Sequence, residues 1–251
     1  MKKNVVFIVN FQESDRGGPY QYSVNSWKNW CKKNDFTFFV LSERIHEKEI
    51  MNPNWHKLFV FDVLEKNKID YDQILVADAD TIVHPDCPNF FALSNNKLCG
   101  VHNEGSYDWV FRSIENYSKF IFKGFTFPFW RYINSGFLIL NDSHKSFYKE
   151  VINFYLNNAD TIQKMQETFQ VGTDQPIINF FLNIHKIDYN ILPYEFNMQD
   201  MSRKEILDEE LTFTKLGWVY HFNAIPNNQS SDKSLYWMKK TYNTLYKEKQ
   251  A

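Results

Sequence analysis

The chain has 251 residues, of which 43% are hydrophobic and 23% charged, and its formal net charge is -2. This balance is typical of a globular core and excludes general disorder, and the charge gives no bulk attraction to nucleic acid. The three cysteines, Cys31, Cys87 and Cys99, form no closely spaced pair. We therefore expect buried free thiols rather than a disulfide framework or a zinc site.

The first predicted element is a strand over residues 5–10. Lys2 and Lys3 precede the apolar run Val5 to Val9, which is too short for the core of a signal peptide and has no small-residue cleavage site after it. A continuous apolar run of this length is typical of a strand buried on both faces. No stretch approaches the roughly 18 apolar residues of a membrane-spanning helix. We expect no transmembrane segment and a location in the cytoplasm or at the cytoplasmic face of a membrane.

The later elements are predicted from apolar spacing, and strands alternate with helices through the first half. After a polar loop at 12–19, the expected helices cover 20–33, 55–66, 146–156, 175–182 and 233–246. The expected strands cover 36–41, 73–77, 98–102, 133–140 and 218–222. No repeat or flexible linker divides the chain. The pattern predicts a single α/β domain over residues 1–251, with a mainly parallel sheet between helices.

Two carboxylates, Asp78 and Asp80, follow the predicted strand over 73–77. Open α/β sheets bind ligands at the carboxyl ends of their strands, and the residues just after Val9 lie at such an end too. Extended residues two apart share a face, so these carboxylates repel each other unless a cation lies between them. Mn²⁺ or Mg²⁺ suits such oxygen ligands. A second pair, Asp70 and Asp72, is placed in the polar turn before the strand and interpreted as solvated.

Residues 71–83, which read YDQILVADADTIV, resemble the "YD-hydrophobic-DxDT" segment of GT-A glycosyltransferases. The resemblance is closest to glycosyltransferase family 8, the glycogenin and lipopolysaccharide-galactosyltransferase group, with family 34 as a near relative. Further segments that resemble motifs of this group follow the expected order: Trp55-His56-Lys57, Asn134-Ser135-Gly136, Asp174-Gln175 and Tyr220-His221-Phe222. Together they extend over most of the chain.

The resemblance implies a GT-A, Rossmann-like fold and a metal-dependent glycosyltransferase. Such an enzyme transfers a hexose or pentose from a nucleotide-diphosphate sugar, most often a UDP-sugar, to a hydroxyl of a glycan, a lipid-linked glycan or a protein. The anomeric configuration would be retained. Residues 1–140 would form the nucleotide-binding half and residues 141–251 the acceptor-binding half.

The resemblance also implies roles for individual residues. Asp78, Asp80 and His221 would hold Mn²⁺ or Mg²⁺. The donor would be bound by Asn10, Phe11, Tyr20, Lys57, Asp78, Ala79, Ser135, Gly136 and Lys233. Asp174, Gln175 and Asn134 would lie near the anomeric carbon and act in catalysis.

Structural roles remain open for several of these residues. Tyr20 could be an ordinary core aromatic, Lys57 could lie on a solvated helix face, and Thr173 or Asp174 could cap a helix that begins near Pro176. The chain also departs from the family after His221, where a glycine and a basic residue usually follow. Here no basic residue occurs before Lys233, so either Lys233 reaches back or asparagine amides take that role.

Two other functions are compatible with parts of the sequence. A nucleotidyltransferase uses a related sheet and a metal, but its Gly-rich basic loop is represented only by Arg16-Gly17-Gly18. A catalytically inactive sugar-binding module is the other alternative. The aromatic-rich segment 107–132 favours core packing, although exposed rings such as Trp130 could stack on an acceptor sugar or lie at a lipid interface.

Overall fold

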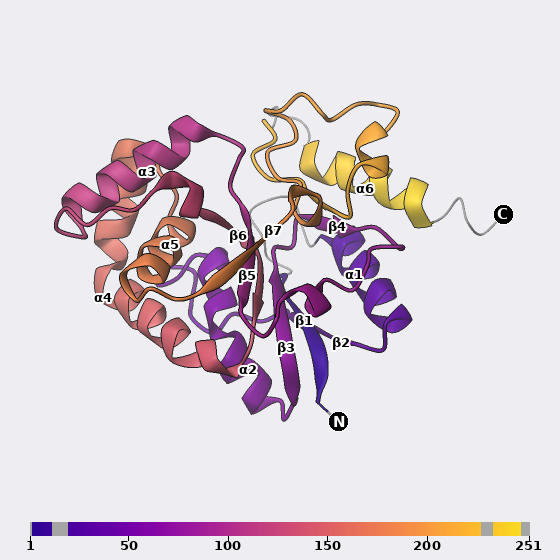
Figure 1. Cartoon of the computed structure of the whole chain (residues 1–251), viewed down its shortest axis with the longest axis horizontal. Coiled ribbons are helices and arrows are strands. Elements are labelled where there is room, and N and C mark those ends of the chain that lie inside the picture. Colours follow the sequence, from indigo (N-terminus) through magenta and orange to yellow (C-terminus); the bar gives the residue numbers. More distant parts are fainter. Residues whose placement is uncertain (1, 12–19, 227–232, 247–251) are drawn as a thin grey trace.

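The centre of the molecule is a six-stranded sheet with the order β2-β1-β3-β6-β5-β7 (Figure 1). A computed structural model describes residues 2–11, 20–226 and 233–246. Within them the strands of this sheet are β1 (Lys3–Val9), β2 (Thr37–Leu41), β3 (Tyr71–Ala77), β5 (Leu98–His102), β6 (Ile133–Leu140) and β7 (Tyr189–Leu192). β6 is antiparallel to both of its neighbours, and the other pairs are parallel. The sheet is mixed and mainly parallel, which confirms the predicted fold class.

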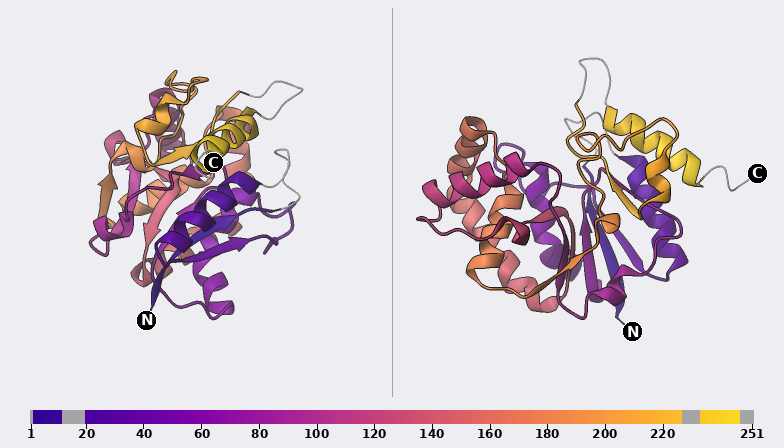
Figure 2. Two further views of the ribbon diagram at one scale, coloured as in Figure 1. Left: turned by 90° about the vertical axis from the view of Figure 1, so that its right-hand side faces the viewer. Right: turned by 45° about the horizontal axis from the view of Figure 1, so that its top comes forward.

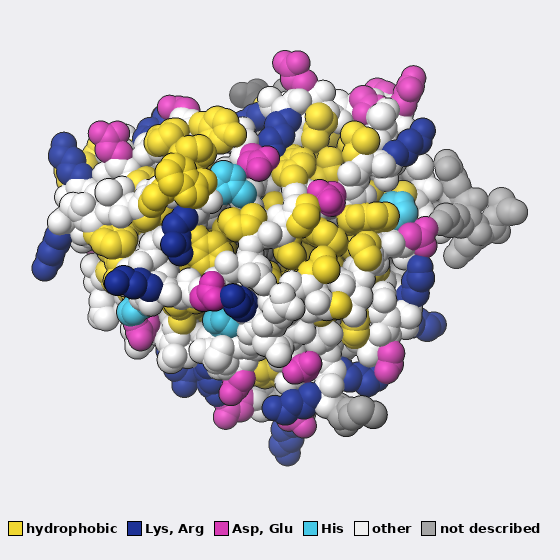
Figure 3. Space-filling view, viewed as in Figure 1, with side chains coloured by type: hydrophobic (Ala, Val, Ile, Leu, Met, Phe, Trp, Pro, Cys, Tyr) yellow, Lys and Arg dark blue, Asp and Glu magenta, His cyan; other side chains and the backbone are white. Residues whose placement is uncertain are grey.

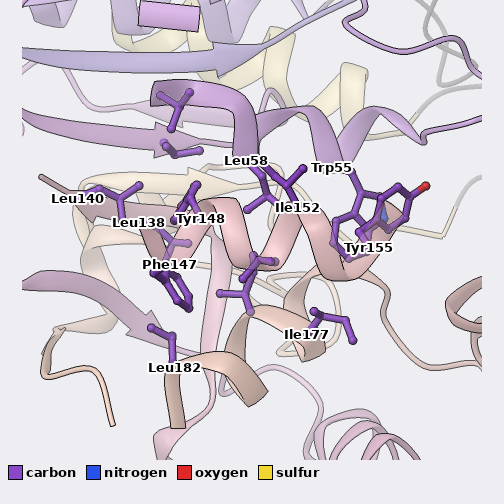
Figure 4. Packing of buried hydrophobic residues seen from close by; sticks show 14 of the residues in the cluster. Trp55, Leu58, Leu138, Leu140, Phe147, Tyr148, Ile152, Tyr155, Ile177 and Leu182 are labelled. Atoms are coloured by element: carbon purple, nitrogen blue, oxygen red, sulfur yellow. The ribbon is translucent and has the colours of Figure 1, made fainter. Parts of the chain in front are cut away.

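Each face of the sheet carries its own apolar core, which explains the continuous apolar runs of the central strands. In β1, Val5 and Phe7 point to one core, and Val6 and Ile8 point to the other. The first core is covered by α2 (Val60–Lys66), α3 (Tyr107–Phe120), α4 (Lys145–Phe169) and α5 (Asp174–Ile184), and the second by α1 (Gln21–Lys33). In the first core, the rings of Trp55 and Tyr155 stack with centroids 4.1 Å apart (Figure 4).

A short second sheet joins two segments that lie far apart in the sequence. β4 (Thr81–Val83) pairs antiparallel with β8 (Val219–His221), and Thr81 lies opposite His221. α6 (Lys233–Tyr246) covers this ribbon and lies beside α1 (Figure 2), where the rings of Tyr22 and Tyr242 are 5.6 Å apart. The pairing places His221 next to the chain that leaves Asp80.

Several element boundaries differ from the sequence prediction. The segment predicted as one helix over 55–66 is a 3₁₀ helix, η1 (Pro53–Phe59), followed by α2, with Pro53 at its first position. The helix predicted over 146–156 continues to Phe169 and ends at Gln170, which has a left-handed backbone with φ of 53°. The placement of Asp72 in a turn was wrong, because Tyr71 and Asp72 belong to β3 itself.

Two strands and one α-helix were not predicted: β4, β7 and α3. β4 and β7 have only three and four residues, too few for a clear period. α3 does carry an apolar stripe, with Val110, Ile114 and Tyr117 buried, but this stripe was not identified as a helix from the sequence. The predicted loop at 12–19, with Arg16-Gly17-Gly18, lies outside the described residues. Among the residues that are described, no helix has the length and apolar character needed to cross a membrane.

Candidate functional site

A cleft of about 530 Å³ opens at the edge of the sheet where β1 and β3 end. Because β6 runs antiparallel to β3, the amino end of β6 reaches the same edge. The N-terminus of α5 and the end of β8 complete the walls. The predicted site residues that line the cleft are Asn10, Phe11, Tyr20, Lys57, Asp78, Ala79, Asp80, Asn134, Ser135, Asp174, Gln175 and His221. Gly136 and Lys233 are the two that do not.

Asp78, Asp80 and His221 form a compact cluster of potential metal ligands, with one atom of each within 4.8 Å of the others. His221 Nε2 lies 3.1 Å from Asp80 Oδ1 and 3.8 Å from Asp78 Oδ2. Adjacent ligands of an octahedral ion are about 3 Å apart when each bond is about 2.1 Å, so the spacing fits such an ion. Asp80 and His221 are buried, whereas the Asp78 side chain is 32% exposed and faces the cleft.

The charge state of His221 reflects this setting. Burial alone would lower the pKa of His221, but the carboxylates of Asp80 and Asp78 favour the imidazolium and raise the pKa above its usual value. Two oxygen donors with one imidazole form a donor set that a borderline metal such as Mn²⁺ accepts. The residues therefore fit a divalent cation that would be shared with a substrate.

Gly136 makes room for this cluster although it does not line the cleft. A Cβ at position 136 would lie 2.4 Å from His221 Cε1 and 2.7 Å from Asp78 Oδ2. The Asn134-Ser135-Gly136 segment could also be a β-bulge, and the β5–β6 pairing supports this, because its register shifts between Gly100↔Leu138 and His102↔Ile133. The glycine is needed for close approach of two side chains.

Lys57 lies at the centre of the site rather than on a solvated helix face. Its Nζ is 3.0 Å from Asp78 Oδ1 and 2.9 Å from Asp174 Oδ2. It also donates to the Ser135 carbonyl and hydroxyl oxygens at 3.2 Å. Burial would lower the pKa of Lys57, but the carboxylates of Asp174 and Asp78 raise it above its usual value. Lys57 therefore links the group of potential metal ligands to Asp174.

Asp174 is held from several directions at the start of α5. Its Oδ1 accepts a hydrogen bond from Asn54 Nδ2 at 2.6 Å, and its Oδ2 accepts one from Ser135 Oγ at 3.0 Å. Burial would raise the pKa of Asp174, but the charge of Lys57 and these hydrogen bonds bring the pKa below its usual value. Thr173 makes no side-chain capping bond. Asp174 is thus an ionised carboxylate that faces the cleft.

The residues near the start of the cleft come from the end of β1 and the start of α1. The Tyr20 amide donates to Asn10 Oδ1 at 3.2 Å. The rings of Phe11 and His56 pack edge to face with their centroids 4.9 Å apart, and the Arg44 guanidinium lies 5.0 Å from the centroid of the Phe11 ring. Tyr20 also packs in the apolar core beneath the β4–β8 ribbon, so it serves as a core aromatic and lines the cleft.

The remaining expectations have mixed outcomes. Lys233 begins α6, next to Ser234, whose hydroxyl donates to the Phe222 carbonyl at 3.0 Å. Of the aromatic segment, Trp109 lines the cleft, while Trp130 is 62% exposed outside it. Figure 3 shows hydrophobic side chains gathered over α3, where Tyr107 and Phe111 are also exposed. All three cysteines are free and buried, as expected.

Sequence reasoning missed several asparagines in and around the site, three of which hydrogen bond to its predicted residues. Asn54 holds Asp174, while Asn103 and Asn197 hydrogen bond to Asn134. Asn103 directly follows β5 at the ligand-binding edge, so its position could have identified it. Asn54 and Asn197 lie in irregular segments and carry no comparable signal.

Comparison with known proteins places the fold. No family model matches the chain, and no curated protein matches it in sequence. A solved glycosyltransferase involved in the glycosylation of the major capsid of PBCV-1 aligns with a TM-score of 0.59 and 12% identity, over 94% of this chain and 98% of the other. The glycosyltransferase GlyE of Streptococcus pneumoniae TIGR4, in its apo form and in a second structure, aligns with a TM-score of 0.54 and 14% identity.

The alignment with GlyE covers 99% of this chain but only 63% of GlyE, so the chain spans less than two thirds of that protein. At these identities the likeness concerns the fold, and the resemblance to family 8 or 34 stays a prediction. The chain has the fold of solved glycosyltransferases, and its cleft holds an Asp-Asp-His cluster that could bind a metal ion.

Proposed function

We propose that the protein is a metal-dependent glycosyltransferase that transfers a hexose or pentose from a nucleotide-diphosphate sugar to an acceptor hydroxyl, with retention. The observation that carries the proposal is the content of one cleft. An Asp-Asp-His cluster lies beside an ionised carboxylate, Asp174, and Lys57 bridges the two. This combination lies at the ligand-binding edge of a fold shared with glycosyltransferases.

The donor would extend along the cleft from the end of β1 toward α5. Asn10, Phe11 and Tyr20 would hold the base and ribose, with uracil as the expected base. Asp78, Asp80 and His221 would hold a divalent cation, which offsets the negative charge of a departing diphosphate. The sugar would then lie beside Asp174, with Gln175 and Asn134 as hydrogen-bonding partners.

Asp174 would act through its charge. Since Lys57, Asn54 and Ser135 hold it ionised, it can stabilise positive charge that develops on the sugar in an oxocarbenium-like transition state. The acceptor hydroxyl would attack from the face that the diphosphate leaves, and its proton would pass to the leaving phosphate oxygen. The bond to the acceptor would form as the bond to the diphosphate breaks, which retains the configuration.

The acceptor would approach from the side of α4. A second hollow of about 220 Å³ lies there and shares Asn52, Gln166 and Thr173 with the cleft. Thr173 adjoins Asp174, so a group in this hollow would be close to the sugar. Trp109 stands at the same end of the cleft and offers a ring for stacking. A glycan, a lipid-linked glycan or a protein side chain could present its hydroxyl there.

Thermal-shift measurements against UDP-, GDP-, CMP- and dTDP-sugars, with and without Mn²⁺, test the proposal. A ligand that binds the native state raises the melting temperature. We expect a metal-dependent rise for one nucleotide, and its loss in Asp80→Ala. Asp72→Ala is a matched control, because Asp72 is exposed at the opposite end of the same strand. No rise with any donor would favour an inactive module instead.

The stereochemistry is tested separately. NMR of the product from an α-linked donor should show an α-linkage. A β-linked product would contradict the retaining mechanism while leaving transferase activity intact.

A further inference from the structure

Four buried side-chain amides form a continuous hydrogen-bonded chain behind the cleft. It runs from His221 through Asn197, Asn134 and Asn103 to Gln175. His221 Nδ1 lies 3.1 Å from Asn197 Oδ1, and Asn197 Nδ2 donates to Asn134 Oδ1 at 3.0 Å. Asn134 Nδ2 and Gln175 Nε2 both donate to Asn103 Oδ1 at 3.1 Å. All of these residues are buried.

Two backbone N–H groups of β6 fix the direction of every bond in this chain. A backbone N–H can only donate, so whatever side-chain atom it meets must be an oxygen. The Gly136 N–H meets Asn134 at 2.9 Å, and the Ser135 N–H meets Gln175 at 2.9 Å. These contacts show that Asn134 turns its Oδ1, and Gln175 its Oε1, toward the backbone of β6. Both assignments are made without reference to His221.

The orientation then passes from Asn134 to His221. Because Asn134 presents its oxygen, Asn197 must turn its NH₂ group toward Asn134 and its oxygen toward His221. An oxygen facing Nδ1 requires that Nδ1 carry the proton. Nε2 faces the oxygens of Asp80 and Asp78, so a cation among them would take the Nε2 lone pair while Nδ1 keeps its proton for Asn197.

The other branch ends at Gln175. Asn103 accepts from both Asn134 and Gln175, so its oxygen lies between two NH₂ groups. This leaves Gln175 with its oxygen on the Ser135 N–H and holds its side chain against the wall of the cleft. A flipped amide at Gln175 would place two N–H groups in opposition.

We propose that Asn197 and Asn103 are positioning residues: Asn197 fixes the metal-facing tautomer of His221, and Asn103 fixes the amide of Gln175. Only the expected effect on metal affinity rests on the proposed metal-dependent function. The orientation of the Asn197 amide, by contrast, is set within the chain by its hydrogen bond to Asn134. Outer-shell partners of metal-binding histidines are commonly worth about 10–100-fold in metal affinity.

The first test is ¹⁵N NMR of histidine in the wild-type protein saturated with Mg²⁺, which is diamagnetic. Long-range ¹H–¹⁵N couplings show which ring nitrogen carries the proton, and we expect His221 to keep its proton on Nδ1. An Nδ1 without a proton would overturn the proposal. This measurement needs neither a variant nor a functional enzyme, so its outcome is independent of whether the protein is a transferase.

The second test measures Mn²⁺ affinity by calorimetry in three variants. Asn197→Leu removes the acceptor, and we expect affinity about 10–100-fold weaker than wild type. Asn197→Asp keeps an acceptor for Nδ1–H but loses the donor to Asn134, and we expect its affinity to lie between those of Asn197→Leu and wild type. Asn103→Leu leaves the Gly136 anchor of Asn134 intact, and we expect little change. Equal affinity in Asn197→Leu and wild type would overturn the proposal, whereas a wild type that binds no metal would contradict the proposed function instead.

Discussion

At the scale of single residues, Lys57 is a cation whose side chain is only 4% exposed and whose charge is balanced by two carboxylates. Removing one partner of a buried ion pair is costly because the other charge stays buried and unpaired. We expect Lys57→Met to lower the free energy of unfolding by about 3–5 kcal/mol. Urea denaturation at pH 7 measures this.

A control for Lys57 exists at the surface. Lys145 forms an ion pair with Glu65, in which the Lys145 side chain is partly exposed and that of Glu65 is mostly exposed, and surface pairs contribute little to stability. Lys145→Met should therefore unfold at nearly the wild-type urea concentration. Equal losses in the two variants would mean that the Lys57 network does not stabilise the fold.

Asp174 predicts a specific response to acid. Its pKa is below the usual value in the folded chain, so its contribution to stability is present above the unfolded-state pKa of about 3.9 and is lost as the pH falls through the folded-state pKa. We expect Asp174→Asn to lose stability less steeply than wild type below about pH 4. Urea unfolding from pH 2 to pH 6 measures the two slopes, and parallel curves would contradict the assignment.

Many of the residues that line the cleft could be predicted individually because they follow the ends of apolar strands. Asp78, Asp80 and Asn10 follow apolar runs, and the sheet topology then brings those ends together. The partners that fix their chemistry were not predictable. Asn197 contacts His221 across 24 residues, and Asn54 contacts Asp174 across 120 residues. Such pairs depend on loop geometry that no local periodicity encodes.

At the scale of elements, the amino end of β6 carries the closest packing of the site. Gly136→Ala would place a Cβ within 2.7 Å of both His221 and Asp78. We expect it to abolish Mn²⁺ binding and to destabilise the fold by about 1–3 kcal/mol. Calorimetry and urea denaturation measure the two effects.

The neighbouring strand offers a matched glycine. A Cβ at Gly100 in β5 would meet the end of the Ile133 side chain at 2.8 Å, and that flexible end can move aside. Gly100→Ala should keep its Mn²⁺ affinity. If both alanine variants bind the metal equally well, steric closeness at Gly136 is not what shapes the cluster.

Elements with strong periodicity were predicted well, and weakly periodic ones were not. α6 matches its predicted range, and β6 does too. β7 lies at the edge of the described sheet beside β5. Of its four residues only Leu192 is buried, so its sequence has little apolar pattern. α4 was predicted too short because its second half packs with few apolar residues, among them Ile162 and Met165.

At the scale of the whole molecule, the β4–β8 ribbon connects the Asp-Asp-His cluster to α6, which packs against β4. The Phe222 N–H donates to the Asp80 carbonyl at 2.9 Å, and His221 pairs with Thr81. An ion held by Asp80 and His221 would resist opening of this ribbon. With Mn²⁺ at 100 times its dissociation constant, we expect hydrogen exchange of ribbon amides to slow by about 100-fold.

Exchange at β7 provides the internal reference, since β7 contributes no residue to the cluster. Where exchange occurs by local opening, the exchange rates of the β7 amides should be the same with and without Mn²⁺. Slowing at β7 without slowing at the ribbon would show that the metal binds elsewhere.

The pairing of Thr81 with His221 also has a consequence for biosynthesis. Thr81 and His221 lie 140 positions apart in the sequence. Bringing them together closes a long loop, which costs chain entropy. We therefore expect this contact, with its large sequence separation, to form late in folding. A nascent chain would display Asp78 and Asp80 without their histidine until nearly all of the sheet had left the ribosome. A metal ion would therefore bind at the end of folding and would not assist its early steps.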